Sequence, residues 1–304
     1  MINDGLSARA RLFNITRGSF IDGYGIRTTI FLKGCPLRCK WCCNPEGQKF
    51  TPELRFIEDR CKDCGKCIDK CANSALSITD GRFTIDRKVC QVSGECISAC
   101  WYDAIQIFGK ESTAEDVFND IIKDKIFFED SGGGLTIGGG EATCYPEFCL
   151  EMIERCHEAG ISVAIDSCGY MTHENSFEVL AKADFVLLDI KGLDNEQHIR
   201  NTGVSNKPIL ETLRRLEEID QHVIIRYPMI PGYNLGEAEN IAEFLTHYSC
   251  VKRVDLIGYH KFGESKYAEI GMEYTVEGES MEEKERERVL EIFLAKGLNA
   301  QIGG

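Results

Sequence analysis

The sequence predicts an α/β fold, namely a partial (β/α)6 TIM-like barrel that carries a small cysteine-rich insert. Three observations support this prediction. After residue 111, β-rich runs alternate with amphipathic helices, which is the pattern of a parallel sheet. Six such units can be counted in the 304 residues, too few to close a barrel of eight strands. Residues 61–107 interrupt the alternation with a dense set of cysteines.

The first strand is predicted at residues 27–33, a largely apolar run that leads directly into the first cysteines. The other β-rich runs lie beyond the insert, and the helices between them require parallel pairing. These runs are residues 133–140, 161–166, 184–191, 222–228 and 253–260.

The helices are predicted from apolar periodicity and from capping residues. Residues 112–125 begin with a Ser-Thr pair suited to an N-cap, and residues 146–160 end at a glycine. Residues 281–296 carry Glu-to-Lys and Glu-to-Arg pairs on their polar face. The remaining amphipathic segments are residues 175–183, 206–219 and 236–248.

Composition narrows the class of protein. A hydrophobic content of 43% is enough for one core of about 200–250 residues and a small appendage. The net charge of −14 argues against nucleic acid or an anionic membrane as a partner. No apolar run is long enough to span a membrane, and the N-terminal residues lack the apolar region of a signal peptide. Sixteen cysteines then indicate reduced thiols and metal binding in a cytoplasmic protein.

Three cysteines follow the first strand with the spacing C-x3-C-x2-C: Cys35, Cys39 and Cys42. Three thiolates can hold three irons of a four-iron cluster and leave one iron open, and an open position makes a metal site catalytic. A structural zinc site is the alternative, but it needs a fourth ligand, and Cys43 is too close to Cys42 to reach the same metal easily. The role of Cys43 stays undecided. The triplet resembles that of radical S-adenosylmethionine enzymes, whose cosubstrate offers an amino and a carboxylate group to the open iron.

The insert contains a 29-residue repeat, whose copies start at Arg60 and Val89. The first copy has the cysteine spacing of bacterial ferredoxins, which predicts an inserted two-cluster ferredoxin-like domain. In such domains the fourth cysteine of each run binds the other cluster. This rule assigns Cys61, Cys64, Cys67 and Cys100 to one auxiliary [4Fe-4S] cluster and Cys71, Cys90 and Cys96 to the other.

The second cluster lacks one thiolate, because Ser93 stands where the first copy has Cys64. Ser93, a water or a cysteine from elsewhere can complete the site, or the cluster is a three-iron one or absent. Zinc bound by four thiolates is the alternative for the whole domain.

Polar residues follow the predicted strands at their carboxyl ends, where parallel α/β folds bind their ligands. They are Gly139, Gly140, Glu141, Asp166, Ser167, Asp189, Lys191, Arg226 and His260. For the cosubstrate, Glu141 is suited to the ammonium, Lys191 and Arg226 to the carboxylate, and Asp189 to the ribose hydroxyls. The glycines allow close approach of the backbone. His260 is suited to contact the adenine or the cluster, and Asp166 to neutralise the sulfonium or hold a small cation.

Residues 20–47 resemble the N-terminal signature of the glycyl-radical-enzyme activating enzymes, with Tyr24 where a proline is usual. Residues 139–141 resemble the family's Gly-Gly-Glu motif, although Gly138 and Ala142 depart from its flanks, and residues 189–191 resemble its D-x-K contacts. The resemblance extends to the GESKY stretch at residues 263–267. It also implies a monovalent-cation site at Asp166 and Ser167. In this family, a ferredoxin-type insert is found in the activases of choline trimethylamine-lyase, isethionate sulfite-lyase and 4-hydroxyphenylacetate decarboxylase. The motifs CNPEGQ (residues 43–48) and LTIGGGEAT (residues 135–143) look most similar to those of the choline-lyase and isethionate-lyase activases.

The resemblance implies residues 1–54 and 111–304 as the barrel and residues 55–110 as the insert. It implies a [4Fe-4S] cluster with S-adenosylmethionine, reduced by a low-potential carrier such as flavodoxin or ferredoxin, with the insert clusters as a route for the electron. The 5′-deoxyadenosyl radical would take a hydrogen atom from a glycine of a partner enzyme, in an anaerobic setting. No catalytic residue is expected beyond the cluster and the cosubstrate.

Two other functions compete with this one. The first is a radical enzyme acting on a small molecule or a peptide. The second is a non-catalytic iron–sulfur electron carrier, for which the open cluster and the Gly-Gly-Glu turn would have no use. The remaining cysteines are predicted to be small buried hydrophobes: Cys144, Cys149, Cys156, Cys168 and Cys250.

Overall fold

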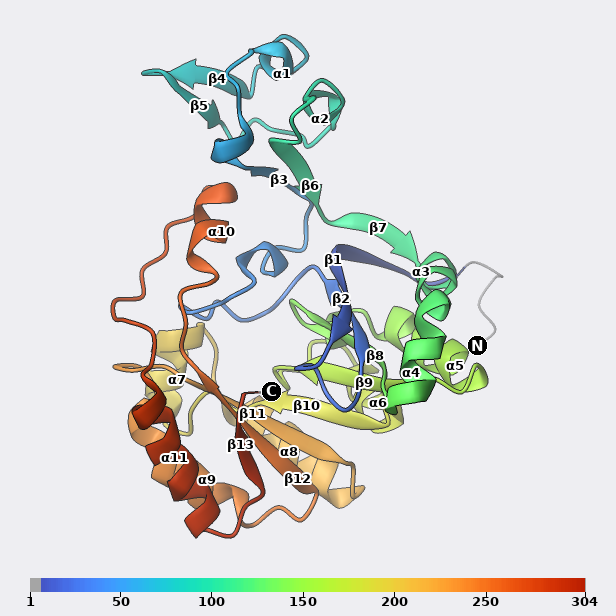
Figure 1. Ribbon diagram of the computed structural model, residues 1–304, viewed down its shortest axis with the longest axis vertical. Coiled ribbons are helices and arrows are strands. Elements are labelled where there is room, and N and C mark those ends of the chain that lie inside the picture. The colour runs from blue at the N-terminus through green and yellow to red at the C-terminus, as the bar shows by residue number, and fades with distance from the viewer. Residues whose placement is uncertain (1–6, 304) are drawn as a thin grey trace.

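A computed structural model describes residues 7–303. Within that range one large sheet has the strand order β13-β12-β11-β10-β9-β8-β2-β1-β7 (Figure 1). The six predicted strands form its centre and pair in parallel, which confirms the mostly parallel α/β sheet. They are β2 (Arg27–Leu32), β8 (Gly134–Gly139), β9 (Ser162–Ser167), β10 (Phe185–Asp189), β11 (Val223–Met229) and β12 (Val251–Gly258).

The sheet of the described residues is wider than the six predicted strands. β1 (Arg9–Ser19) and β7 (Lys110–Thr113) extend one edge in antiparallel pairing, and β13 (Ala300–Ile302) extends the other in parallel. β1 and β7 are largely polar and half exposed, as suits an edge, and β13 has three residues. None of the three has the buried apolar run that identified the central strands.

The predicted helices are present, with one correction. The predicted helix 112–125 is split: β7 ends at Thr113, whose hydroxyl accepts the Asp116 N–H at 3.0 Å and starts α3. A short 3-10 turn then leads into α4. The helices that match predictions are α3 (Ala114–Ile121), α5 (Pro146–Glu158), α6 (Ser176–Lys182), α8 (Lys207–Glu218), α9 (Ala238–Leu245) and α11 (Glu283–Ala295), whereas α4 (Lys125–Ser131) lies almost wholly beyond the predicted segment 112–125.

Two short helices of the large domain were not predicted, α7 (Asn195–Thr202) and α10 (Glu264–Glu269). Their sequences, NEQHIRNT and ESKYAE, have no apolar stripe from which a helix can be recognised. Both helices contact the cysteine loop described below. Within residues 7–303, no helix combines the length and the apolar character that a membrane crossing needs.

The two faces of the large sheet are filled differently. Apolar residues such as Val163, Val186 and Leu188 pack against the helices in the main core. On the opposite face Leu187 and Ile224 belong to a separate, smaller cluster. Because side chains alternate along a strand, residues two positions further on share this second face and lie nearer the carboxyl ends.

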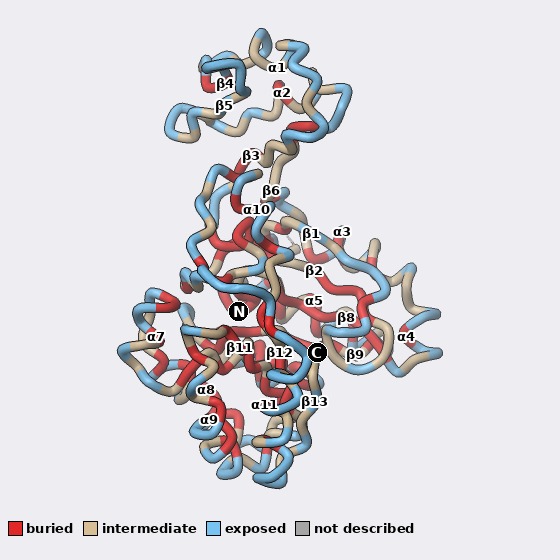
Figure 2. Tube along the Cα trace, turned by 60° about the vertical axis from the view of Figure 1, so that its left-hand side comes forward, coloured by how far each residue is buried: buried red, intermediate tan, exposed pale blue. Residues whose placement is uncertain are grey.

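The insert lies away from the large sheet (Figure 1). It contains two antiparallel pairs, β3 (Glu53–Phe56) with β6 (Ile105–Phe108) and β4 (Leu76–Thr79) with β5 (Arg82–Ile85). Its short helices are α1 (Lys66–Asp69) and α2 (Glu95–Ser98). Figure 2 shows burial concentrated around the large sheet, whereas the insert is mostly exposed or half buried. Its core in the described residues consists of Leu54, Leu76, Cys96 and Ile105.

The predicted 29-residue repeat is confirmed in the backbone of the insert. Three positions with positive φ recur after 29 residues, an uncommon conformation outside glycine. The pairs are Asp63 (φ 47°) with Val92 (φ 52°), Gly65 (φ 73°) with Gly94 (φ 88°), and Ser74 (φ 52°) with Asp103 (φ 50°). The two copies therefore fold their cysteine segments in the same way.

Candidate functional site

The first three cysteines lie on a loop that follows β2, residues 34–44, here called the cysteine loop. Segments far away in the sequence hold its backbone. The Arg38 N–H donates to Thr202 O at 2.7 Å and the Lys40 N–H to Asn201 O at 3.0 Å, both at the end of α7. Leu37 and Trp41 anchor the loop by burial. The loop is thus shaped by α7 and not by its own sequence.

Helix α10 holds the other end of the cysteine loop. The Tyr267 hydroxyl donates to Cys42 O at 2.9 Å, and the Lys266 ammonium donates to Cys43 O at 2.9 Å. Lys266 also pairs with the buried carboxylate of Glu46 at 3.0 Å. Apart from the family resemblance of the GESKY stretch, no local signal pointed to these two residues.

The strand-end residues share one face of the sheet, as the alternation requires. Asp166, Asp189 and Arg226 lie two positions beyond Ala164, Leu187 and Ile224, which form the small cluster on that face. Arg226 pairs with Asp166 at 2.9 Å, and Lys191 pairs with Asp189 at 2.5 Å. A charged surface therefore continues the apolar cluster toward the carboxyl edge.

This charged surface faces the cysteine loop. Burial opposes the charges of Lys191 and Arg226, but the neighbouring carboxylates outweigh it and raise the pKa of both side chains, so both stay cationic. Burial raises the pKa of the Cys39 and Cys43 thiols, and the charge of Lys191 opposes this rise at Cys39 as the charge of Arg226 does at Cys43. The structure therefore brings Asp189, Lys191 and Arg226 together with the loop, as the strand-end argument predicted.

Glu141 is buried, and donors from the β9 turn surround its carboxylate. Oε1 accepts from the Thr143 N–H (3.0 Å), the Thr143 hydroxyl (2.7 Å) and the Ser167 hydroxyl (2.8 Å). Oε2 accepts from the Cys168 N–H at 2.7 Å. A carboxylate oxygen has two lone pairs, so Oε2 keeps room for a further donor.

The glycines before Glu141 pack directly on the cysteine loop. A Cβ atom at Gly140 would lie 2.3 Å from Gly34 O and 2.4 Å from Gly47 O. The Glu141 N–H donates to Gly34 O at 2.8 Å. The missing side chain of Gly140 therefore lets the backbone of the cysteine loop and of Gly47 pack directly on this turn. This packing fixes the Gly-Gly-Glu turn against the loop.

The thiols of the cysteine loop are suited to an iron–sulfur cluster. Burial raises the pKa of Cys39 to about 12 and raises that of Cys42 further. A hydrogen bond from the Cys168 side chain lowers the pKa of Cys35. Soft, half-buried thiols with cations beside them fit a metal that displaces the proton on binding.

His260 is half buried. Its charged neighbour is Lys266, the residue that donates to Cys43 O in the cysteine loop. Its ring stacks on Phe262 with centroids 4.4 Å apart, and burial lowers its pKa. Phe262 is 83% exposed. His260 therefore presents a neutral ring at the open rim of the site and makes no ion pair with the strand-end residues.

A buried lysine, not singled out in the sequence, lies where the insert leaves the sheet. The Lys33 ammonium is fully buried, pairs with Glu53 at 2.7 Å and donates to Glu46 O at 2.6 Å. Burial lowers its pKa. An ion pair of this kind fixes the first residue of the insert's β3 to the end of β2.

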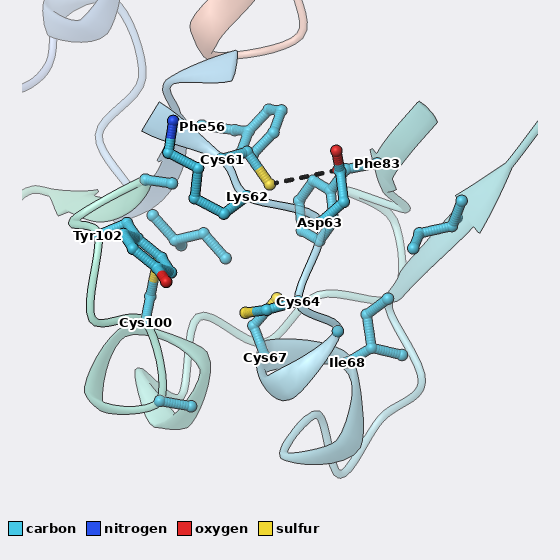
Figure 3. Close-up of a pocket in the computed structure, with 15 residues that line it drawn as sticks. Phe56, Cys61, Lys62, Asp63, Cys64, Cys67, Ile68, Phe83, Cys100 and Tyr102 are labelled. Atoms are coloured by element: carbon cyan, nitrogen blue, oxygen red, sulfur yellow. Dashed lines mark hydrogen bonds between the residues drawn. The ribbon is translucent and has the colours of Figure 1, made fainter. Parts of the chain in front are cut away.

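The cysteines of the insert line two cavities. One is lined by Cys61, Cys64, Cys67 and Cys100 (Figure 3), and the other by Cys71, Cys90, Cys96 and Ser93. Burial raises the pKa of Cys67 to about 11, with Cys100 and Cys61 as charged neighbours, and the neighbours of Cys96 include Cys90 and Cys71. The grouping follows the crossed arrangement predicted from the repeat.

The five remaining cysteines are buried, as predicted: Cys144, Cys149, Cys156, Cys168 and Cys250. Among residues 7–303, no three His, Cys, Asp or Glu side chains converge on one point as a single metal ion requires.

Comparison with known proteins places the chain in a family. Residues 29–245 match the family model described as the radical SAM superfamily. A radical SAM methyltransferase from Sphaerobacter thermophilus has a similar fold, with a TM-score of 0.52 and 13% identity over 91% of this chain and 66% of its own.

Two curated relatives are closer in sequence. The trans-4-hydroxy-L-proline dehydratase activating enzyme of Clostridioides difficile is 38% identical over 96% of this chain and 99% of its own length. The choline trimethylamine-lyase activating enzyme of Oleidesulfovibrio alaskensis is 36% identical over 93% and 94%. Relatives with different partner enzymes thus match almost equally well over nearly full length. The chain belongs to the radical SAM superfamily and, within it, to the activating enzymes of glycyl radical enzymes.

Proposed function

We propose that this chain activates a partner glycyl radical enzyme by reductive cleavage of S-adenosylmethionine. The observation that carries the proposal is the arrangement of Asp189, Lys191 and Arg226 around the thiols of the cysteine loop. When bound to Cys35, Cys39 and Cys42, a [4Fe-4S] cluster supplies the electron that cleaves the cosubstrate, and the 5′-deoxyadenosyl radical takes a hydrogen atom from a glycine of the partner.

In this proposal the charged face of the sheet binds and orients the cosubstrate. Lys191 and Arg226 hold its carboxylate, because both remain cationic beside their carboxylate partners. Glu141 receives its ammonium on Oε2, the oxygen that accepts a single protein donor. Asp189 receives the ribose hydroxyls.

Asp166 and His260 take the remaining parts of the cosubstrate. Asp166 lies two residues beyond the apolar cluster on the same face and is proposed to face the sulfonium. Burial raises the pKa of its carboxyl to about 7 although Arg226 opposes the rise, so a nearby cation would favour its ionised form. His260 offers its neutral ring to the adenine at the rim. The monovalent cation at Asp166 and Ser167 stays a prediction, since these two side chains are engaged by Arg226 and Glu141.

We also propose that residues 55–110 form a ferredoxin-like domain with auxiliary [4Fe-4S] clusters, inserted between residues 1–54 and 111–304 of a partial barrel. The two cavities and their crossed cysteine sets support this proposal. So does the small core of the insert, because a unit of this size seldom folds without a metal or another crosslink.

A low-potential carrier such as flavodoxin or ferredoxin is the proposed reductant, with the insert as its relay. Sixteen thiols require a reducing compartment, for which we propose the cytoplasm. The partner enzyme is not specified, because relatives of this chain act in different systems at similar identity.

The proposal is tested by anaerobic reconstitution with iron and sulfide, followed by dithionite and S-adenosylmethionine. The expected product is 5′-deoxyadenosine from the wild type and none from Cys39→Ala. Cys250→Ala is the control, because Cys250 is a buried cysteine outside the cysteine loop and directly precedes β12, at the opposite end of the strands. Absence of product from a wild type with a filled, reducible cluster would contradict the proposal. A glycyl radical signal on an added partner then tests the second step.

A further inference from the structure

The second cysteine cavity of the insert lacks a fourth thiol. We propose that the hydroxyl of Ser93 supplies the missing ligand, so that this site binds a four-iron cluster through Cys71, Cys90, Cys96 and the serine oxygen. The inference rests on the auxiliary clusters proposed above and deepens that proposal. With this assignment one insert site has four thiolate ligands, whereas the other has three thiolates and one serine oxygen.

The position of Ser93 carries the first part of the argument. Cys64 lines the first cavity with three other cysteines, and Ser93 lines the second with three cysteines. The two residues are 29 positions apart, which is the period of the repeat, and both are exposed. Ser93 thus lines the second cavity at the position of the repeat where Cys64 lines the first.

The backbone before Ser93 carries the second part. Val92 has φ 52°, and the equivalent Asp63 has φ 47°. Aspartate tolerates this left-handed conformation, whereas a β-branched residue rarely adopts it. The second copy has retained the ligand-bearing turn of the first in spite of an unsuitable residue. Strain of this kind is typical of segments that bind a ligand.

The chemistry balances without a redox step. When the Ser93 oxygen binds iron, the O–H bond breaks, an Fe–O bond forms and the proton leaves to solvent. Oxygen is also the harder donor and favours the more oxidised iron, so the reduction potential should be lower than with a fourth thiolate.

The test uses the full chain, reconstituted anaerobically with iron and sulfide, in the wild type, Ser93→Ala and Ser93→Cys. Ser98→Ala is the control, because Ser98 ends α2 and bonds to Gly94 O at 3.4 Å without lining the cavity. We expect Ser93→Ala to lose about one iron per chain and to gain the paramagnetic signal of an oxidised three-iron cluster. Ser93→Cys should keep the iron of the wild type and raise the potential of one cluster. Ser98→Ala should match the wild type.

Two results would overturn the assignment. One is a Ser93→Ala protein with the iron content, spectrum and potentials of the wild type, since the serine oxygen would then bind nothing. The other is a wild type that holds no cluster in the second cavity. The 5′-deoxyadenosine assay on the same samples separates these outcomes from failure of the proposed function, because it reports on the cysteine loop.

Discussion

The cysteine loop and the cysteine segments of the insert bring thiols together in opposite ways. The loop is shaped by distant parts of the chain: α7 binds its first half, α10 its second half, and the Gly-Gly-Glu turn its base. The insert segments are shaped locally, by short turns that recur after 29 residues. We expect the cysteine loop to keep its conformation without a metal, whereas we expect the cysteine segments of the insert to need a bound metal to stay folded.

The largest effect is expected from Glu141→Gln, which disturbs the hydrogen bonds to the buried carboxylate beside the cysteine loop. An amide nitrogen would face donors that now bind a carboxylate, and a buried unsatisfied donor costs about 1–3 kcal/mol. We expect a loss of about 2–4 kcal/mol in the free energy of unfolding and at least about a 100-fold drop in 5′-deoxyadenosine formation. Denaturant unfolding and the cleavage assay measure the two effects. Glu147→Gln, at an exposed position in α5, is the control. Unchanged cleavage in Glu141→Gln would remove Glu141 from the site.

Removal of iron should separate the two regions. A chelator should leave the large sheet folded, because its core is extensive, and should unfold the insert, whose core is small. Limited proteolysis of the iron-free protein is expected to cut within residues 57–104 at least about 10-fold faster than in the loaded protein. Equal protection of the insert with and without iron would show that it folds without a metal, against the comparison drawn here.

These two tests also mark what a sequence can reveal. The repeat of the insert could be predicted because its two copies carry the same cysteine spacing in the sequence, and the backbone conformation recurs with the same period. The central strands could be predicted because they are continuous apolar runs. α7 and α10 could not, because polar segments of six to eight residues give no periodic signal and act through contacts across more than 150 residues. Buried Lys33 was missed because a lysine after a strand is usually exposed, and only the fold brings the Glu53 carboxylate to it.

Tyr267→Phe should have a moderate effect on the cysteine loop. It removes the hydroxyl that donates to Cys42 O and leaves the ring in place, which costs about 1 kcal/mol. We expect about a 5-fold faster loss of iron from the loop cluster on exposure to chelator. Tyr274→Phe is the matched control, because its hydroxyl bonds to Tyr259 and its ring packs on Tyr267. If both variants release iron at the same rate, α10 does not hold the loop.

The smallest effect is expected from Val92→Gly, which tests whether the positive φ at Val92 strains the insert. Glycine adopts positive φ without the clash of a β-branched side chain, but it also gains freedom in the unfolded chain. The balance should stabilise the folded insert of the iron-loaded protein by about 0.5–1 kcal/mol, seen as slower cleavage within residues 57–104. Asp63→Gly at the equivalent turn should give less, because aspartate already tolerates φ 47°. A larger gain from Asp63→Gly would mean that the strain lies elsewhere in the repeat. The second copy would then have no special reason to keep its ligand-bearing turn, and the argument that places Ser93 on the second cluster would lose its backbone support.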